Sequence, residues 1–154
     1  MFKCKKIFLL LIAAIFMTGP ASFSYGANTT DEATALVEKA ISFLKTSGKD
    51  KMIAEISNNK GLFVKDDLYV FVLDMSGICL AHGGSKSLIG RDMTKLKDYD
   101  GRYFIKDVVE GAKKKGSGWV DYHWANPTTK AWDKKNTYFK KDGTLIYCCG
   151  IYTK

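Results

Sequence analysis

Hydrophobic positions near residue 30 recur at helical spacing. Apolar residues three or four positions apart between residues 33 and 44 predict one face of an amphipathic helix. Thr29 and Glu32 have the spacing of a capping box, which places the start of this helix directly after Thr29. After Gly48, the apolar residues among positions 52–56 predict a second, shorter helix.

The pattern then changes to that of strands. Residues 68–74 are rich in β-branched and aromatic side chains, which predicts a buried strand. A turn at Ser76-Gly77 leads into a returning strand at residues 78–82. Residues 83–99 are polar and have no sustained period, and loops of this length in a compact domain are usually functional or mobile.

One more helix and three strands complete the chain. The helix is predicted at residues 104–115 and ends at Gly116. The strands are predicted at residues 119–124, 134–140 and 144–152. Asp142-Gly143 between the last two strands is a strong hairpin signal. This order of elements predicts an α+β domain with an antiparallel five-stranded sheet and helices on one side of it.

The first 27 residues have the composition of a secretory signal peptide. Three lysines precede an apolar run of about 11 residues, and small residues follow that run. Because a helix needs roughly 20 apolar residues to cross a bilayer, a cleaved signal peptide is favoured over an uncleaved membrane anchor. We therefore expect residues 1–27 to be removed and residues 28–154 to form one periplasmic or secreted domain.

The distribution of charge argues against a nucleic-acid partner. The chain has 24 Lys and Arg against 16 Asp and Glu, a net charge of +8 that includes the signal-peptide lysines. The other lysines are spread along the chain. Their one tight cluster, residues 113–115, lies at the predicted end of a helix, where cations interact favourably with the helix dipole. A basic patch of the kind that binds nucleic acid is therefore not expected.

The cysteines favour burial over a disulfide scaffold. Cys79, Cys148 and Cys149 lie in the expected exported part, and an odd number leaves at least one thiol unpaired. Their spacing does not match a zinc site, a redox pair or a haem attachment sequence, so we expect small buried apolar side chains. Adjacent residues alternate across a strand, which predicts that at most one of Cys148 and Cys149 faces the core.

No set of residues predicts catalysis. Cys79 and His82 are close in sequence, but this spacing is not specific for a nucleophile and its base. No pair of carboxylates stands out for acid and base chemistry either. We expect no enzymatic activity, no cofactor and no metal site.

Several short segments follow one another in an order and spacing typical of a known family. They are residues 69–74, 80–82, 88–90, 100–104, 116–124, 126–127, 135–138 and 150–152. This series resembles the single-Cache sensor domains (Cache type 2). With the leading helix included, the resemblance covers residues 30–154. The chain departs from the family at Gly83-Gly84-Ser85, where prolines are common, and at Trp132-Asp133, where Glu-Pro is common. The glycines are expected to loosen this loop because they widen its accessible backbone angles.

The resemblance implies a PAS-like sheet behind a long N-terminal helix, with a ligand pocket between the sheet and a loop-helix segment that crosses it. Cache domains usually stand outside the membrane as sensors of chemoreceptors and histidine kinases, and short carboxylates are typical of the single-Cache type. We therefore expect an exported, stand-alone domain that binds a short carboxylate for sensing or signal transduction. The alternative is a module that docks on a membrane chemoreceptor or histidine kinase without a ligand of its own.

Four residues on two neighbouring predicted strands have the chemistry for such a ligand: Tyr122, Trp124, Lys135 and Tyr138. A carboxylate held out of water needs a cation or several donors, which Lys135 and the two phenols supply, while aromatic walls limit the size of the ligand. The alternative is ordinary sheet packing with a solvated lysine. Lys135 and Tyr138 have opposite parity, so a regular strand sends them to opposite faces unless a bulge intervenes or one of them lies outside the strand.

The two histidines are expected to differ in role. His82 ends a predicted strand at the start of the long loop, where its imidazole either donates to a ligand or holds the loop backbone, and both roles stay open. His123 is expected to be an exposed strand residue. Asp74 and Asp121 are expected to serve a turn and a strand edge. The predicted ligand-binding set is thus His82 together with the four residues named above.

Overall fold

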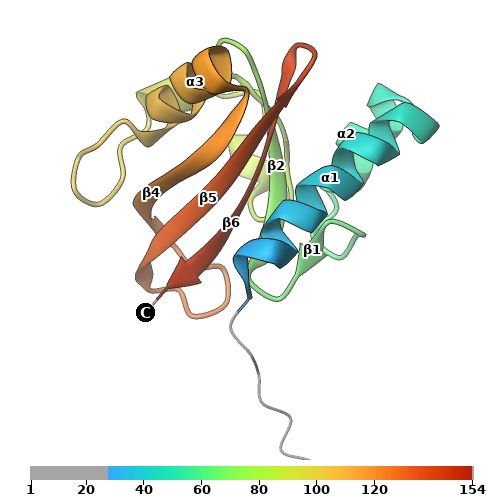
Figure 1. The fold of residues 1–154 in the computed structure, drawn as a ribbon. Coiled ribbons are helices and arrows are strands. Elements are labelled where there is room, and N and C mark those ends of the chain that lie inside the picture. The colour runs from blue at the N-terminus through green and yellow to red at the C-terminus, as the bar shows by residue number, and fades with distance from the viewer. Residues whose placement is uncertain (1–27, 154) are drawn as a thin grey trace, which may run out of the picture.

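The computed structural model describes residues 28–153 (Figure 1). The predicted signal peptide at residues 1–27 lies outside the described residues. Within the described range, no helix is both long enough and apolar enough to cross a membrane.

Two helices open the described part of the chain. In α1 (Thr30–Ser47) the capping box forms as predicted: the Glu32 amide donates to Thr29 Oγ1 over 3.2 Å, and the Thr29 amide donates to Glu32 Oε2 over 2.9 Å. Gly48 ends α1 with a φ of 85°, a backbone conformation that glycine adopts at little cost. α2 (Lys49–Ile56) follows directly. The periodicity therefore predicted both helices correctly.

The strands form one antiparallel sheet. They are β1 (Val64–Lys65), β2 (Leu68–Asp74), β3 (Cys79–His82), β4 (Ser117–Ala125), β5 (Trp132–Asp142) and β6 (Leu145–Thr153). The path through the sheet is β1-β2-β6-β5-β4, and β3 pairs with β2 beside that path. The five predicted strands are β2 to β6. The sixth, β1, has 2 residues, too few for an alternating pattern to reveal it. The α+β fold prediction is confirmed.

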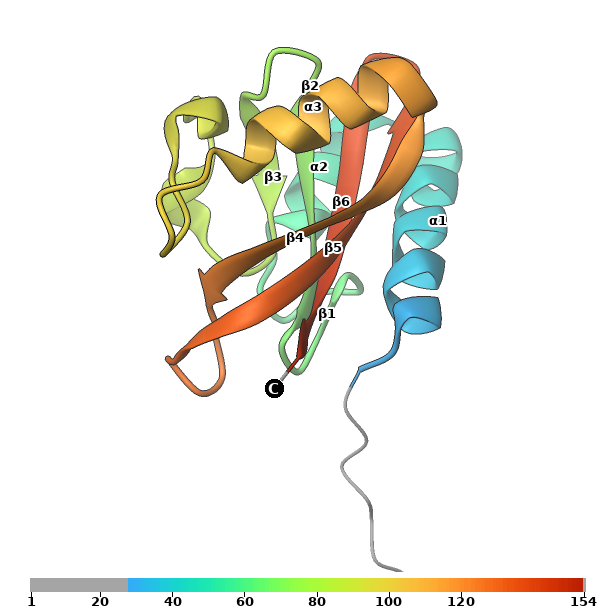
Figure 2. The same ribbon diagram turned by 60° about the vertical axis from the view of Figure 1, so that its left-hand side comes forward.

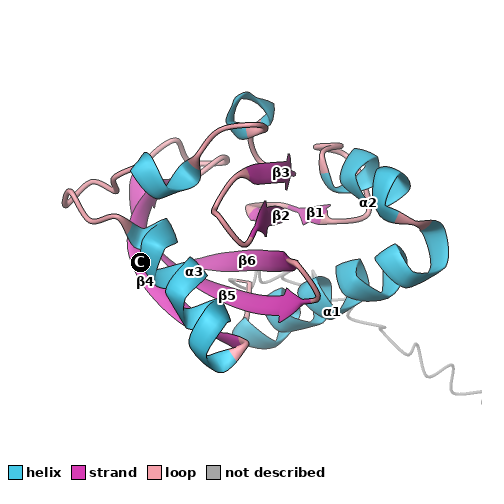
Figure 3. Cartoon of the chain, turned by 90° about the horizontal axis from the view of Figure 1, so that it is seen from above, coloured by secondary structure: helices cyan, strands magenta, loops and turns pink. Residues whose placement is uncertain are grey.

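The helices cover both faces of this sheet, whereas the sequence predicted one (Figures 1 and 3). α1 and α2 lie on one face, in a core that includes Ile56 and Val70. α3 (Phe104–Lys115) lies on the other face, in a core that includes Phe71 and Val108. Successive strand residues point to opposite faces, so β2 contributes to both cores. The periodicity of a helix identifies its buried positions but not the sheet face that it covers, and the one-sided arrangement was wrong.

Because helices cover both faces of the sheet, cysteines on either face can be buried. Cys79, Cys148 and Cys149 are buried and free. Cys148 belongs to the core beneath α3 and Cys149 to the core beneath α1, each with no exposed surface. The prediction that at most one of the adjacent pair faces the core was therefore wrong. Burial as small apolar side chains, the other prediction, is what the structure shows.

A long segment crosses the α3 face from β3 at one edge of the sheet to β4 at the other (Figure 2). Residues 83–103 are irregular except for two short 3₁₀ helices, η1 (Lys86–Leu88) and η2 (Met93–Lys95). The Gly90 amide donates to the carbonyl oxygen of Cys79 over 2.7 Å, which fastens the segment to β3. The crossing loop-helix segment was thus predicted correctly, and it covers the sheet face on which the candidate site lies.

Candidate ligand site around Lys135

Lys135 is fully buried in the sheet face beneath α3, with no exposed surface. It lies on β5, where Lys135, Thr137 and Phe139 alternate with less buried residues on the opposite face. Its register partners are Tyr122 on β4 and Tyr152 on β6. A lysine at the centre of a sheet is rare because burial of an unpaired charge is unfavourable, so the surroundings of its ammonium group decide what the site can do.

Two tyrosines surround the Lys135 ammonium group. Nζ lies 3.8 Å from the ring centroid of Tyr69 and 4.5 Å from that of Tyr152, distances typical of cation–π contacts. Nζ also donates to the Tyr152 hydroxyl over 3.3 Å. The Tyr152 hydroxyl in turn donates to the carbonyl oxygen of Ala125 over 3.1 Å. Lys135 has no ion pair with any carboxylate among residues 28–153, so only aromatic rings and a hydroxyl stabilise its charge.

Burial therefore acts strongly on the acid–base state of this site. Burial lowers the pKa of Lys135 from 10.5 to about 7, although Cys149, Asp67 and Cys148 oppose the shift. The same burial raises the pKa values of Tyr69 and Tyr122 well above the usual 10. The phenols thus keep their protons at neutral pH and can donate hydrogen bonds, and Lys135 is poised between its charged and neutral forms.

Gly150 on β6 provides the space that the Lys135 side chain occupies. A Cβ atom at this position would lie 2.5 Å from Lys135 Cε and would also meet Thr137 Oγ1. Real Cβ atoms essentially never approach other heavy atoms this closely. Only glycine lets the lysine chain cross β6 to the Tyr69 ring.

His82 fastens the start of the crossing segment. Its Nδ1 accepts from the amides of Gly84, over 3.1 Å, and Ser85, over 2.9 Å. The ring lies 5.1 Å from Tyr69 and 5.3 Å from Phe71 between centroids. Of the two roles left open by the sequence, the structure shows the hold on the loop backbone. Because Nδ1 is an acceptor, the proton of the neutral ring lies on Nε2. Burial, followed by the charge of Lys135, lowers the pKa of His82 to about 3.

The glycines after His82 are held more closely than expected. The Gly83 amide donates to the carbonyl oxygen of Val70 over 2.9 Å. Gly84 packs on the ring of Tyr69 so closely that a Cβ atom there would lie 2.9 Å from two ring carbons. Glycine is thus required here for close packing against Tyr69, and the predicted loosening of the loop is not what the hydrogen bonds show.

Tyr122 and Trp124 form an aromatic wall with Phe104 at the start of α3. Tyr122 stacks on Phe104 with centroids 3.9 Å apart, and Trp124 lies 5.3 Å from the same ring. The Tyr122 hydroxyl accepts from Thr137 Oγ1 over 2.9 Å. Lys135, Tyr122 and Trp124 therefore share one sheet face, as the predicted site requires.

Tyr138 lies on the opposite face of the sheet from Lys135. It packs against the core beneath α1, and its ring lies 5.2 Å from Trp119. The register between β4 and β5 runs without a break from Ser117 to Ala125, so the bulge that would have united Tyr138 and Lys135 is not present there. The structure does not bring Tyr138 together with the other predicted residues, because a regular strand separates residues of opposite parity.

Sequence reasoning missed Tyr69 and Tyr152, whose rings lie against the ammonium group. Tyr69 lies in a strand whose first six residues are all buried, so nothing in its pattern distinguishes it from packing. The position of Tyr152 next to Lys135 could have been predicted from the sequence. The hairpin turn at Asp142-Gly143 sets the register that places Tyr152 opposite Lys135, and extending that register along both strands would have found the pair.

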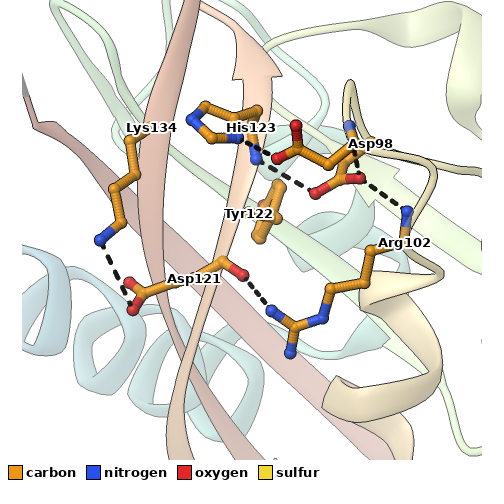
Figure 4. A pocket seen from close by; sticks show the side chains of 7 residues that line it. Asp98, Arg102, Asp121, Tyr122, His123 and Lys134 are labelled. Carbon is orange, nitrogen blue, oxygen red and sulfur yellow. Dashed lines mark hydrogen bonds and ion pairs between the residues drawn. The ribbon is translucent and has the colours of Figure 1, made fainter.

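A cavity of about 190 Å³ lies at the outer edge of β4 and is lined by Tyr122 of the candidate site together with charged residues (Figure 4). Its charged residues connect the crossing segment to the unpaired edge of β4. Asp98 accepts from the amides of Arg102 over 2.8 Å and His123 over 3.4 Å. Arg102 donates to the carbonyl oxygen of Asp121 over 2.8 Å. Asp121 therefore lies at a strand edge, as predicted, and this edge is covered by side chains of the crossing segment.

Three side chains near this cavity have atoms of the kind that bind metal ions. One ligand atom each of Asp98, Asp100 and His123 lies within 4.8 Å of the others. His123 Nδ1 already lies 2.6 Å from the Asp100 carboxylate, and both Asp98 oxygens accept from backbone amides. We therefore interpret the group as the contact that holds the loop to β4. His123 was expected to be exposed, but its side chain is only 39% exposed because of this contact.

Cys79 and His82 do not form a catalytic pair. The Cys79 thiol contacts the carbonyl oxygen of Ala81, and the acceptor nitrogen of His82 is occupied by backbone amides. Burial raises the pKa of Cys79 to about 11, so its sulfur stays protonated and is a weak nucleophile.

The chain also matches a known protein family. Residues 13–145 match the family described as Single Cache domain 2. The chain belongs to this family. The match extends over most of the chain, and the resemblance seen in the sequence is confirmed.

Solved structures show the same Cache fold. The methyl-accepting chemotaxis protein from Vibrio parahaemolyticus RIMD 2210633 matches with a TM-score of 0.69 and 23% identity, over 79% of this chain and 86% of that chain. A structure described as the periplasmic sensor domain of a chemotaxis protein matches with a TM-score of 0.63 and 19% identity, over 80% of this chain and 90% of that chain. A Cache chemosensory domain described for carboxylic acid recognition matches with a TM-score of 0.64 and 23% identity, over 80% of this chain and 88% of that chain. At these identities the likeness shows that the chain has the fold of these domains.

Proposed function

We propose that this Cache domain binds a short carboxylate against Lys135, between the sheet and the crossing segment. The observation that carries the proposal is the buried ammonium group without a carboxylate partner among the described residues. A carboxylate would supply the missing negative charge. The Tyr152 hydroxyl lies 3.3 Å from Lys135 Nζ and the Tyr69 hydroxyl lies 3.4 Å from that of Tyr152, so both would be near the bound carboxylate. The aromatic wall of Tyr122, Trp124 and Phe104 would then limit the organic part of the carboxylate to a small size.

The ligand class also has support outside the chain. One structural neighbour is described as a Cache domain that recognises carboxylic acids. At 23% identity this likeness shows the fold alone, so the chemistry of Lys135 is the main support. His82 Nε2–H makes no hydrogen bond within the described residues, and the ring lies 5.1 Å from that of Tyr69. We include it in the proposed site as a further donor.

We propose further that the domain works outside the cytoplasm. Residues 1–27 have the composition of a signal peptide, and removing them leaves the domain intact from Asn28 onward. A structural neighbour titled as a periplasmic sensor domain is compatible with this location. Signal transduction would then pass through a membrane chemoreceptor or histidine kinase.

The test is thermal unfolding of residues 28–154 with acetate, propionate, lactate, pyruvate, amino acids and amines. A carboxylate at about a hundred times its dissociation constant should stabilise the fold by about 2.7 kcal/mol. The Lys135→Met variant should lose this stabilisation. Lys141→Met on the same strand, where the lysine is exposed, is the matched control and should keep it. A folded protein that no member of the panel stabilises would contradict the proposal.

A second candidate function is docking on a membrane receptor or kinase without a ligand. Tyr99 is 71% exposed and Trp132 is 53% exposed, and their rings lie 5.9 Å apart. Exposed aromatic pairs are common at protein interfaces. A pull-down from envelope extract that recovers a receptor with wild-type protein, and not with Tyr99→Ser plus Trp132→Ser, would favour docking. Recovery of no receptor would count against it.

A further inference from the structure

The charge environment of Lys135 differs from that of an ordinary anion-binding lysine. Surface lysines stay charged whether or not an anion is present, because water stabilises the ammonium group. Lys135 has no exposed surface and no carboxylate partner among the described residues, and its Nζ contacts two aromatic rings and one hydroxyl. In the free protein this setting favours the neutral amine, whereas a bound carboxylate favours the ammonium ion.

We propose that Lys135 takes up a proton when a carboxylate binds, so that the domain responds to the anion and the proton together. This inference rests on the proposed function and concerns the regulation of the same site. The step balances as one carboxylate anion and one proton from water entering the site, with no other bond made or broken. The domain would then report the concentration of the acid as a whole, and a rise in pH would weaken binding even at constant carboxylate concentration.

The other titratable groups that contact Lys135 or interact with it electrostatically do not supply this proton. They are Tyr69 on β2, His82 on β3, Tyr122 on β4, and Cys148, Cys149 and Tyr152 on β6. Burial raises the pKa of each phenol and each thiol, so these groups stay neutral below pH 9. His82, with a pKa of about 3, stays neutral above pH 5. Phe104 of α3, above Tyr122, carries no charge.

Asp67 is the acidic residue with an electrostatic effect on Lys135, from the turn before β2. Its carboxylate accepts from the side-chain amides of Asn28 over 2.5 Å and Asn126 over 3.3 Å. It forms no ion pair with Lys135. Burial lowers the pKa of Lys135 to about 7, which agrees with a neutral amine at slightly alkaline pH.

Calorimetry tests the coupling directly. Acetate, propionate, lactate and pyruvate are titrated into residues 28–154 at pH 6.5 and pH 8.5, each in two buffers with different ionisation enthalpies. The binding heat should depend on the buffer at pH 8.5, with uptake of nearly one proton, and much less at pH 6.5. Affinity should fall about tenfold for each pH unit above 7.

The two proposals fail in different ways. If none of the four carboxylates binds at either pH, the proposed function is wrong and the coupling with it. If one binds with equal affinity at both pH values and takes up no proton, the coupling is overturned and the proposed function stands.

A spectroscopic readout does not depend on binding. NMR of labelled lysine side chains should show Lys135 losing its proton near pH 7 in the free protein, with Lys135→Met identifying the signal. The midpoint should rise in the presence of a carboxylate that binds. A Lys135 signal that stays charged above pH 9 in the free protein would overturn the coupling. Lys135→Arg, which stays charged, should bind with no pH dependence in this range if it folds.

Discussion

At the scale of single residues, the buried charge of Lys135 predicts a pH-dependent stability. Its pKa is about 7 in the folded protein and 10.5 in the unfolded chain, so the unfolded chain binds more protons between these values. The free energy of unfolding should therefore rise from pH 7 to pH 9.5, at most by about 3 kcal/mol from this residue. Below about pH 6 both states are protonated, and the contribution of Lys135 is constant.

Urea unfolding of residues 28–154 over this pH range measures the effect. In Lys135→Met, which keeps a side chain of similar length without the charge, the rise should disappear and the protein should be more stable at pH 7 than the wild type. Lys141→Met should behave like the wild type. An unchanged pH dependence in Lys135→Met would show that the charge of Lys135 is compensated in the folded protein.

Gly150 has an equally local consequence. Gly150→Ala places a methyl group within 2.5 Å of Lys135 Cε, so the lysine chain or β6 must move. Overpacking of this kind costs about 1–3 kcal/mol. We expect that loss in chemical unfolding together with weaker carboxylate binding. Thr153→Ala, at the exposed end of the same strand, is the control and should change neither quantity. A stable Gly150→Ala variant with normal binding would show that the site tolerates a larger residue.

At the scale of elements, His82 links the candidate site to the crossing segment. His82→Phe keeps the ring stacked against Phe71 but removes the acceptor for the amides of Gly84 and Ser85. Gly84 is exposed and Ser85 is half-buried, so water can replace part of the lost acceptor, and the cost should be about 1 kcal/mol, at the low end of the range for unpaired donors. Hydrogen exchange at these two amides should become faster, while exchange in β5 stays slow. His123→Phe, which changes the other histidine, should leave both amides protected. Unchanged exchange in His82→Phe would remove His82 from this role.

The elements also show where sequence reasoning works and where it stops. Periodicity and the Thr29 capping box predicted α1 well, and the Asp142-Gly143 turn predicted the β5–β6 hairpin. These features depend on residues close together in the sequence. The face that α3 covers depends on how the residue 83–103 segment crosses the sheet, which no local pattern encodes. For that reason the sequence predicted one covered face, and Cys148 and Cys149 were assigned a single core.

The residues of the candidate site also divide into those that local patterns predicted and those that they did not. The alternation of strands correctly placed Tyr122, Trp124 and Lys135 on one face. The same rule argued against Tyr138 in advance, and it stayed in the set only on the assumption of a bulge or of one residue lying outside the strand, whereas both residues lie in β5. Tyr69 comes from a strand that is distant in sequence and adjacent to β6, so its contact with Lys135 depends on the strand order of the whole sheet. When a site is built from several strands, the sequence predicts only the contacts between strands that are joined by a hairpin.

At the scale of the whole molecule, the proposed sensing role depends on export, which a fractionation experiment tests. The full chain is expressed in a bacterial host, and the protein in periplasmic, membrane and cytoplasmic fractions is analysed by intact mass. We expect the periplasmic protein to begin near Asn28, with residues 1–27 removed. Changing Lys3, Lys5 and Lys6 to Glu should hold the chain in the cytoplasm, because the positive region before the apolar run is lost. The triple change Lys113→Glu, Lys114→Glu and Lys115→Glu removes the same charge from the exposed end of α3 and should leave export intact. An intact mass that retains residues 1–27 in the membrane fraction would instead favour an uncleaved anchor, and the carboxylate site would then work on a tethered domain.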